Sequence, residues 1–185
     1  MLSEEKMNNT YRHDIDGLRA IAVLAVVFFH AGFSSFSGGY IGVDVFFVLS
    51  GFLITKSIKA SQEKENFSLV SFYEKRFRRI VPVATLVLFL SSLVGLNILL
   101  PEELRELSQS VVSSLKMTTN FWAANSFDYF GINTDEKPLL HYWSLAIELQ
   151  FYLTFPVLLY ILSRLSKENT EKVTILTFVI ISFIF

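Results

Sequence analysis

The chain alternates between long apolar runs and polar stretches. The apolar runs cover residues 18–36, 40–55, 80–100 and 143–165. Helices of about 20 apolar residues can cross the hydrocarbon core of a bilayer. The second run is shorter, but it contains Gly42, Ser50 and Gly51, and small residues permit close packing between membrane helices. The pattern predicts an all-α fold, a polytopic bundle of transmembrane helices.

The segments outside these runs are less regular. Residues 103–122 are helical in composition but polar for a lipid-facing helix, and residues 123–138 are expected to form a loop. Pro82, near the start of the third run, is expected in the first turn of its helix. Residues 173–185 are apolar but too few to cross a bilayer, so the bundle is expected to be incomplete and truncated in its last helix.

Composition supports a membrane protein and narrows its chemistry. Hydrophobic residues make up 52% of the 185 residues, and the mean hydropathy is +0.47. A net charge of −1 gives no indication of a nucleic-acid partner. The absence of cysteine excludes disulfides, thiolate catalysis and cysteine-based zinc sites, and no metal site is predicted. We expect a cytoplasmic N-terminal arm over residues 1–14 and one membrane domain over residues 15–185.

Basic residues set the expected orientation. They gather between the second and third runs, whereas the glycine turn at 38–39 has none nearby. Positively charged loops stay in the cytoplasm, so the N-terminus is expected inside and the glycine turn outside. The basic residues concerned are Lys56, Lys59, Lys64, Lys75, Arg76, Arg78 and Arg79.

The path of residues 103–122 decides the rest of the topology. If this segment crosses the membrane, then Arg164, Lys167 and Lys172 lie outside, against the charge rule. If it is re-entrant or lies along the surface, they lie inside. Both topologies stay open, and the second is preferred.

Arg19 and His30 interrupt the first apolar run. Eleven positions on a helix bring their side chains to within about 20° of one face, and separate them by about 16 Å along the axis. Ionisable groups in lipid are costly unless they are paired or hydrated, so such a pair indicates a functional site. The structural alternative is a histidine hydrogen-bonded to a neighbouring helix and an arginine that reaches the interface.

Four blocks of the sequence resemble a known family in order and spacing. They are YRHDIDGLRAIAVLAVVFFHAGF (11–33), GGYIGVDVFFVLSGFLIT (38–55), FYEKRFRRIVP (72–82) and PLLHYWSLAIELQFYLTFPVLL (138–159). Together they resemble the membrane-bound acyltransferase family three, whose members acylate surface polysaccharides, lipopolysaccharide O-antigen, peptidoglycan and some small molecules. The resemblance implies a bundle of about ten transmembrane helices, of which this chain carries five to six helical segments.

The resemblance also implies an activity and its partners. An integral enzyme of the bacterial inner (plasma) membrane would take an acyl group from acetyl-CoA or a similar cytoplasmic thioester. It would deliver this group to a hydroxyl of a cell-surface glycan or lipid-linked saccharide. The implied partners are the lipid bilayer, acyl-CoA and the saccharide, with no bound cofactor.

The family's Arg-x10-His pattern falls on Arg19 and His30. Desolvation should keep the imidazole neutral, able to accept a proton from a sugar hydroxyl or to carry an acyl group briefly. Arg19 can meet a donor phosphate or line a polar channel. Asp44 can pair with His30 and raise its basicity, although a contact between helices explains it equally well.

The family's Arg-x-x-Arg falls on Arg76 and Arg79. Residues three apart on a helix point the same way, so two guanidinium groups can bind the phosphates of coenzyme A at the cytoplasmic face. The alternative is a set of charges that only fixes the topology, and Lys75 and Arg78 are better explained that way.

The fourth block places His141, Glu148 and Tyr152 within about 20° of one helical face. Glu148 enters an apolar helix and is expected to be protonated or paired, orienting the catalytic imidazole or binding the acceptor hydroxyl. His141 and Tyr152 are possible acceptor contacts. The family usually has a second acid directly after this one, and here Leu149 replaces it, which weakens any mechanism that needs both carboxylates.

The interpretation is an integral membrane O-acyltransferase present as its N-terminal portion. Two functions of other classes stay open. One is a non-catalytic truncated membrane fragment, whose polar faces would lack the missing helices. The other is a transporter, which is less favoured because neither inverted halves nor a pair of broken helices is visible in the sequence.

Overall fold

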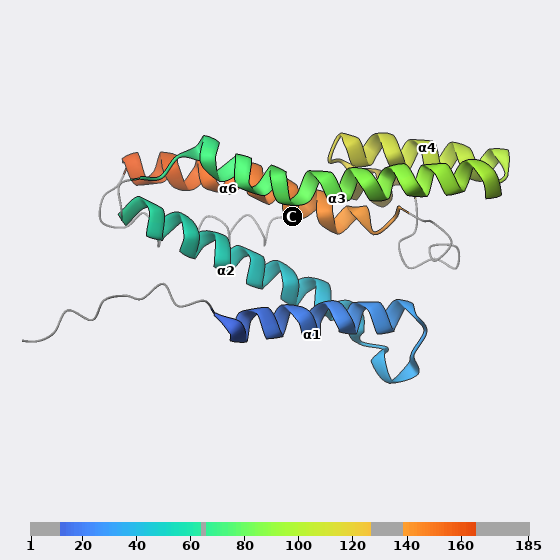
Figure 1. Ribbon diagram of the computed structural model, residues 1–185, viewed down its shortest axis with the longest axis horizontal. Coiled ribbons are helices and arrows are strands. Elements are labelled where there is room, and N and C mark those ends of the chain that lie inside the picture. The colour runs from blue at the N-terminus through green and yellow to red at the C-terminus, as the bar shows by residue number, and fades with distance from the viewer. Residues whose placement is uncertain (1–11, 64–65, 127–138, 166–185) are drawn as a thin grey trace, which may run out of the picture. The chain divides into compact units, whose positions relative to one another are not determined.

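A computed structural model describes residues 12–63, 66–126 and 139–165 (Figure 1). All regular elements in these ranges are helical, so the all-α prediction is confirmed. The chain divides into two units, on either side of residues 64–65. The elements are α1 (His13–His30), the short 3₁₀ helices η1 (Ser34–Phe36) and η2 (Gly39–Ile41), α2 (Gly42–Glu63), α3 (Leu69–Ile98), α4 (Pro101–Leu115), α5 (Thr119–Ser126) and α6 (Tyr142–Leu165).

Three described helices are long and apolar enough to cross a membrane. They cover Gly39–Gln62, Leu69–Ile98 and Tyr142–Ile161. The chain is therefore an integral membrane protein, as predicted. α1 is not among these three, because its 18 residues include three charged side chains, Asp14, Asp16 and Arg19.

The beginning of α1 is polar and exposed. Arg12 donates two hydrogen bonds to the carboxylate of Asp14, at 2.8 and 2.5 Å. These bonds lower the pKa of Asp14 to about 2, so the carboxylate stays charged. An acidic residue in the first turn is also favoured by the partial positive charge of a helix N-terminus.

The end of α1 lies at His30, earlier than the predicted end of the apolar run at Phe36. Gly32 follows with a φ of +78°, a left-handed conformation that glycine adopts without strain. Its N–H donates to the carbonyl of Phe29, and the N–H of Phe33 donates to the carbonyl of Phe28. This pair of bonds, with the rings of Phe28 and Phe33 in contact, is a Schellman cap. The apolar pattern continues past Gly32, but the helix does not.

Two glycines let the start of α2 approach α1 closely. A Cβ atom at Gly39 would lie 2.2 Å from the carbonyl oxygen of Ala25, and one at Gly42 would lie 2.3 Å from that of Ala22. The later glycine, Gly42, contacts the earlier alanine, Ala22, so α1 and α2 run antiparallel. The predicted role of Gly42 in close packing is confirmed.

The polar stretch after the second run is mostly helical, so the predicted boundaries there are wrong. α2 continues to Glu63, and α3 begins at Leu69, where the Ser68 hydroxyl accepts from the N–H of Ser71. Lys, Glu, Gln and Arg are good helix formers, and nothing in this stretch except the short link breaks the helix. Pro82 consequently lies inside α3 and not in its first turn. At this interior position it has no N–H to donate to the carbonyl of Arg78.

Residues 103–122 do not form one helix. α4 has 15 residues and rises about 22 Å, less than the hydrocarbon core of a bilayer. It ends in a second Schellman cap, in which Met117 takes a φ of 58° and the N–H of Thr118 donates to the carbonyl of Ser113. The predicted loop is wrong at its beginning, because α5 extends to Ser126. The rest of that loop, and the last apolar segment, lie outside the described residues.

Two tyrosine hydroxyls fix the register of α3 and α6. Tyr73 donates to the carbonyl of Leu153 at 2.8 Å, and Tyr142 donates to the carbonyl of Ala84 at 2.7 Å. From the first contact to the second, the chain moves eleven residues forward along α3, from Tyr73 to Ala84. Along α6 it moves eleven residues backward, from Leu153 to Tyr142, so the two helices are antiparallel. The first residue of α6 therefore lies level with the middle of α3, and α6 covers only the N-terminal half of α3 (Figure 1).

α4 packs beside the other half of α3 (Figure 1). A Cβ at Gly95 would lie 2.3 Å from Leu107, which shows how closely the two helices approach. Leu107 is buried together with Leu88 and Leu139 in a small apolar core. The unit of α3 to α6 is thus one long helix with α6 along one half and α4 along the other.

The close approach of η2 to α1 gives a first prediction. Gly39→Ala forces a Cβ against a backbone carbonyl that cannot move aside, and should lower the free energy of unfolding by about 1–3 kcal/mol. Gly38→Ala is the matched control, since no atom lies within 4 Å of its Cβ. Denaturant unfolding in mixed micelles measures both. Equal stability of the two variants would contradict the packing.

Candidate functional site

Arg19 and His30 lie on one unbroken helix. α1 runs from His13 to His30, so the eleven-residue spacing keeps both side chains on one side. Ala22 and Ala25 mark the line along which α1 faces α2. Arg19 and His30 both lie roughly 60–80° around the helix from Ala22, in the same direction. They flank the α1–α2 contact along one edge.

Arg19 reaches across to α2. Its guanidinium carbon lies 4.7 Å from the centroid of the Phe46 ring, a cation–π contact. Its Nε atom is buried and has no hydrogen-bond partner within the described part of the chain. A buried N–H without an acceptor costs roughly 1–3 kcal/mol, so this position favours an acceptor oxygen. Arg19 therefore packs against α2, and its buried Nε–H has no acceptor among the described residues.

The imidazole of His30 is held by its own helix. Nδ1 lies 2.8 Å from the carbonyl oxygen of Val26, one turn earlier. A carbonyl oxygen can only accept, so Nδ1 carries the proton. In the neutral ring the lone pair is then on Nε2. The ring edge packs against Phe29, with the centroids 5.0 Å apart. This arrangement gives the ring one basic nitrogen, Nε2, in a defined orientation.

Asp44 is not placed to orient His30 across the α1–α2 contact. Gly42 and Phe46 face α1, and Asp44, midway between them, points about 180° away from that side. Its level along α2 falls between those of Ala22 and Arg19, far from the end of α1. The Val26 carbonyl already occupies Nδ1 of His30. The predicted Asp44–His30 pair is therefore not supported by the packing of this unit.

Arg76, Tyr152 and Glu148 form a polar cluster between α3 and α6. The guanidinium of Arg76 lies 5.5 Å from the ring centroids of both Phe72 and Tyr152. The Tyr152 hydroxyl donates to the Glu148 carboxylate. Tyr152 is 6% exposed, so its ring shields the cation on one side and its hydroxyl reaches the carboxylate on the other. The structure thus brings together residues from two of the four sequence blocks.

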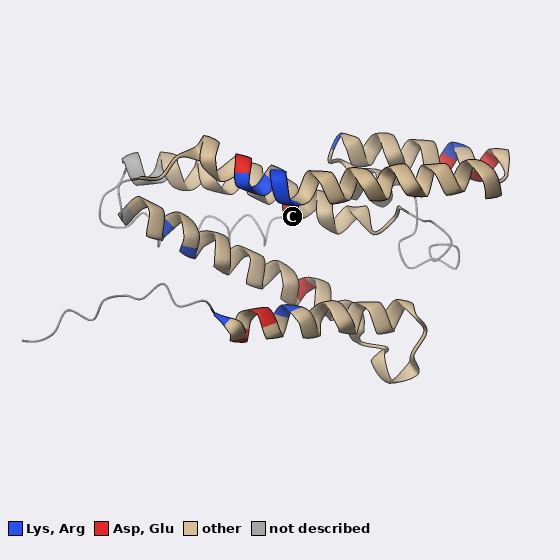
Figure 2. Cartoon of the chain, viewed as in Figure 1, with Lys and Arg blue, Asp and Glu red and all other residues tan. Residues whose placement is uncertain are grey.

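The charges of α3 lie in one stretch of the helix, and its C-terminal half carries none (Figure 2). Arg78 pairs with Glu74 at 2.7 Å, whereas Arg79 is exposed and makes no hydrogen bond or ion pair among the described residues. Arg76 is covered by rings and lies level with the middle of α6, not at a bare helix start. The two arginines of the predicted pair therefore have different surroundings.

The position of α6 also shows the surroundings of His141 and Leu149. His141 is exposed in the turn just before the helix, where its carbonyl accepts from the Ser144 hydroxyl. Leu149 lines a small cavity of about 90 Å³ whose other walls include Ile80, Val81 and Leu145. A second carboxylate after Glu148 would face this apolar lining, which explains why a leucine fits here.

Gln150 is a structural residue that the sequence analysis missed. Its amide donates to the carbonyl of Met117 at 2.7 Å and exchanges hydrogen bonds with the side chain of Asn120. It thereby ties the turn between α4 and α5 to α6. An amide in a largely apolar helix was the available signal. Within the described ranges, no group of three His, Asp or Glu side chains could hold a metal ion.

Comparison with known proteins assigns the family. A family model described as an acyltransferase domain matches residues 12–185. The chain belongs to this acyltransferase family. The match includes all four sequence blocks except for one residue at the start of the first. No solved structure matches the chain at a significant level.

The relatives include enzymes named for the cell wall. The chain is 40% identical over 168 residues to a peptidoglycan O-acetyltransferase of Listeria monocytogenes, covering 88% of this chain and 26% of the relative. It is 35% identical over 176 residues to a putative peptidoglycan O-acetyltransferase of Bacillus subtilis (94% and 28%). It is 36% identical over 169 residues to an O-acetyltransferase of Staphylococcus aureus (90% and 28%). The chain thus spans little more than a quarter of the length of these relatives.

Proposed function

We propose that this chain provides the N-terminal part of an O-acyltransferase that acetylates peptidoglycan. The donor is acetyl-CoA on the cytoplasmic side, and the acceptor is a glycan hydroxyl on the outer side of the plasma membrane. The family and the names of the relatives support this function. The single structural observation behind the mechanism is the His30 ring, whose Nδ1–H is bound to Val26 so that Nε2 is the basic nitrogen.

His30 is proposed as the general base. Nε2 takes the proton of the acceptor hydroxyl, and the hydroxyl oxygen attacks the thioester carbonyl carbon. The carbon–sulfur bond then breaks, and the leaving thiolate takes the proton from the imidazolium. In the alternative order, Nε2 first accepts the acetyl group and passes it to the hydroxyl. Arg19 lines the path of the acyl group, since its Nε, which has no hydrogen-bond partner among the described residues, can donate to a carbonyl or phosphate oxygen.

Arg76 and Arg79 are proposed to hold the phosphates of the donor. Arg79 is exposed and without a partner in the described chain, as an arginine that binds a mobile ligand should be. Arg76 is oriented by the rings of Phe72 and Tyr152. Glu148 and Tyr152 supply a hydrogen-bonded pair that can bind the acceptor hydroxyl, with His141 as a further contact. The topology that we propose has a cytoplasmic N-terminus, and α4 and α5 enter the membrane from the outer side and return to it.

His30 gives the direct test of the chemistry. A chimera carries residues 12–185 in place of the matching region of the Listeria relative, and ester-linked acetate is released from purified peptidoglycan by mild base. His30→Ala should lower this acetate by about 100-fold or more, because the base is lost. His13→Ala, an exposed histidine on the same helix, should leave it unchanged.

Equal membrane insertion of the two histidine variants is the control for folding. Wild-type acetate levels in the His30→Ala chimera would contradict the proposed role. The unextended chain, assayed beside the chimera with labelled acetyl-CoA, shows whether residues 1–185 suffice for transfer.

Neighbouring arginines on α3 test the donor site. Arg79→Ala should raise the KM for acetyl-CoA by roughly tenfold with little change in kcat, since one charge-assisted hydrogen bond to a phosphate is lost. Arg78→Ala is the matched control, because Arg78 already pairs with Glu74, and it should change KM less than twofold. Initial rates of acetyl transfer by membranes containing the chimera measure both. An equal rise in KM for the two variants would mean that only net charge matters.

A further inference from the structure

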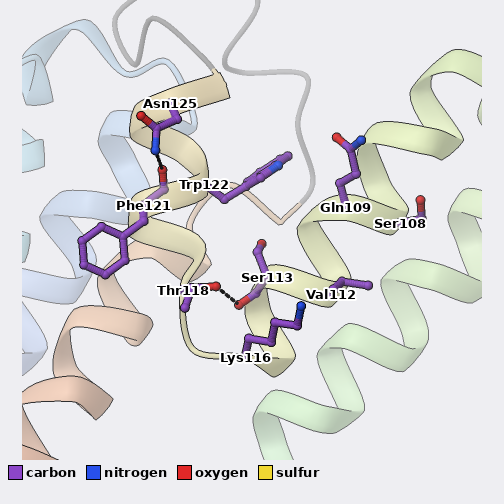
Figure 3. A pocket seen from close by; sticks show the side chains of 9 residues that line it. All are labelled: Ser108, Gln109, Val112, Ser113, Lys116, Thr118, Phe121, Trp122 and Asn125. Atoms are coloured by element: carbon purple, nitrogen blue, oxygen red, sulfur yellow. Dashed lines mark hydrogen bonds between the residues drawn. The ribbon is translucent and has the colours of Figure 1, made fainter.

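A groove of about 630 Å³ lies between α4 and α5, and none of its lining residues belongs to the proposed site (Figure 3). The Trp122 indole extends from α5 toward α4, while Ser113 and Lys116 project from α4 into the same space. The volume lies within the usual range for a small-molecule site. The lining includes Gln109, Val112, Ser113, Lys116, Phe121 and Trp122.

The polar groups of the groove are only partly used by the protein. The hydroxyl of Ser113 donates to the carbonyl of Ser110. The side chains of Gln109 and Lys116, in contrast, make no hydrogen bond or ion pair to any residue that the structure describes, and both are exposed on α4 or at its end. An amide and an ammonium group are therefore available to a ligand.

The groove lies on one side of the membrane. α3 and α6 are each long and apolar enough to cross it, and because they are antiparallel, the end of α3 and the beginning of α6 belong to the same side. α4 and α5 lie between these two points in the sequence, and α4 is too short to cross. Tryptophan side chains such as Trp122 favour the headgroup level of a bilayer. The groove therefore adjoins the leaflet on that side.

The charge and the apolar border of the groove narrow the ligand class. Lys116 is the one charged residue in the described lining, so the groove favours an anion. The last acidic residue of α4, Glu106, lies ten residues or about 15 Å before Lys116, and α5 has no acidic residue. Val112 and Phe121, which border the groove, are exposed apolar side chains. A ligand with a single anionic group beside apolar chains uses both features, whereas a free phosphate would use only the charge.

We propose that the α4–α5 groove binds an anionic glycerophospholipid of the surrounding bilayer, with Lys116 on the phosphate, Gln109 on a headgroup hydroxyl, and Trp122 at the boundary between headgroup and acyl chains. The order of these groups along α4 fits a lipid. Gln109 lies seven residues before Lys116, on the same face of the helix to within about 20° and about 10 Å nearer to the end where α4 follows α3. This inference goes beyond the proposed function and does not depend on it.

The two tryptophans of the chain permit a direct measurement of lipid binding. Trp143→Phe leaves Trp122 as the only indole, and the whole 185-residue chain is reconstituted in nanodiscs of phosphatidylcholine and phosphatidylglycerol. In one series the phosphatidylglycerol carries brominated acyl chains, and in the other series the phosphatidylcholine carries them, at equal mole fractions. Bromine quenches an indole only at short range, so the two series give the relative affinity of the lipids at Trp122. We expect phosphatidylglycerol to be preferred about fivefold.

Variants of the groove separate its contacts. Lys116→Gln should lower the preference to less than about twofold, and Lys116→Arg should retain it, because the phosphate is recognised by charge. Gln109→Ala should lower the preference about twofold, but not that for phosphatidic acid, which lacks a headgroup hydroxyl. Lys56→Gln, at an exposed lysine on α2, is the matched control and should change nothing. Quenching by brominated phosphatidylcholine alone should be equal in all variants, which shows that Trp122 keeps its depth.

Three outcomes would overturn the groove as a phospholipid site. They are equal quenching by the two brominated lipids, an unchanged preference in Lys116→Gln, or loss of the preference when excess glycerol phosphate is added in solution. The last outcome would assign the groove to a soluble anion. Because no acyl donor or acceptor is present, none of these results bears on the proposed function.

Discussion

The packing of the Arg76 guanidinium against the Tyr152 ring is the constraint on which the second unit depends. A cation and a carboxylate are costly between two apolar helices unless each is paired. Here the aromatic ring accepts the cation on its face, and the hydroxyl of the same ring donates to Glu148. The bond between Tyr152 and Glu148 lies within α6, but the contact of Arg76 with Tyr152 forms only in one register of α3 and α6, the register that Tyr73 and Tyr142 also select.

That register has a consequence for the whole unit. α6 covers only the first half of α3, so the second half is left to α4, which approaches it at Gly95. α4 is too short to cross a bilayer, and Met117 turns the chain back into α5. Gln150 then fastens this turn to α6. The proposed lipid groove exists because α4 and α5 are held side by side in this way.

In the first unit, the C-terminal end of α1 fixes the position and orientation of the His30 ring. The cap at Gly32 ends α1 directly after His30, and the Val26 carbonyl fixes the proton on Nδ1. The sequence suggested Asp44 as the acid that orients His30, but Asp44 lies on the side of α2 that faces away from α1. A backbone carbonyl can orient an imidazole as a carboxylate does, but it adds no charge beside the ring.

Much of the fold could be predicted from hydrophobic periodicity, which found α2, α3 and α6 because each has a long apolar run. Boundaries were harder, since Lys56–Glu63 and Leu69–Arg79 are helical although polar. α4 ends at Leu115, and the left-handed residue of its cap is Met117 rather than a glycine that would signal the end. The spacing of Glu148 and Tyr152 correctly placed them together on one face. The packing of Arg76 onto Tyr152 could not be predicted, because it depends on the register between two helices that are far apart in sequence.

The most direct test of this account is a double-mutant cycle between Arg76 and Tyr152. Arg76→Leu, Tyr152→Leu and the double variant are compared by their free energies of unfolding in mixed micelles. A cation–π contact shielded from water predicts a coupling of about 1–2 kcal/mol, and replacing Tyr152 by Phe should retain most of it. Additivity of the two single losses within about 0.3 kcal/mol would show that the ring does not hold the cation, and would contradict the α3–α6 register on which the proposed site is built.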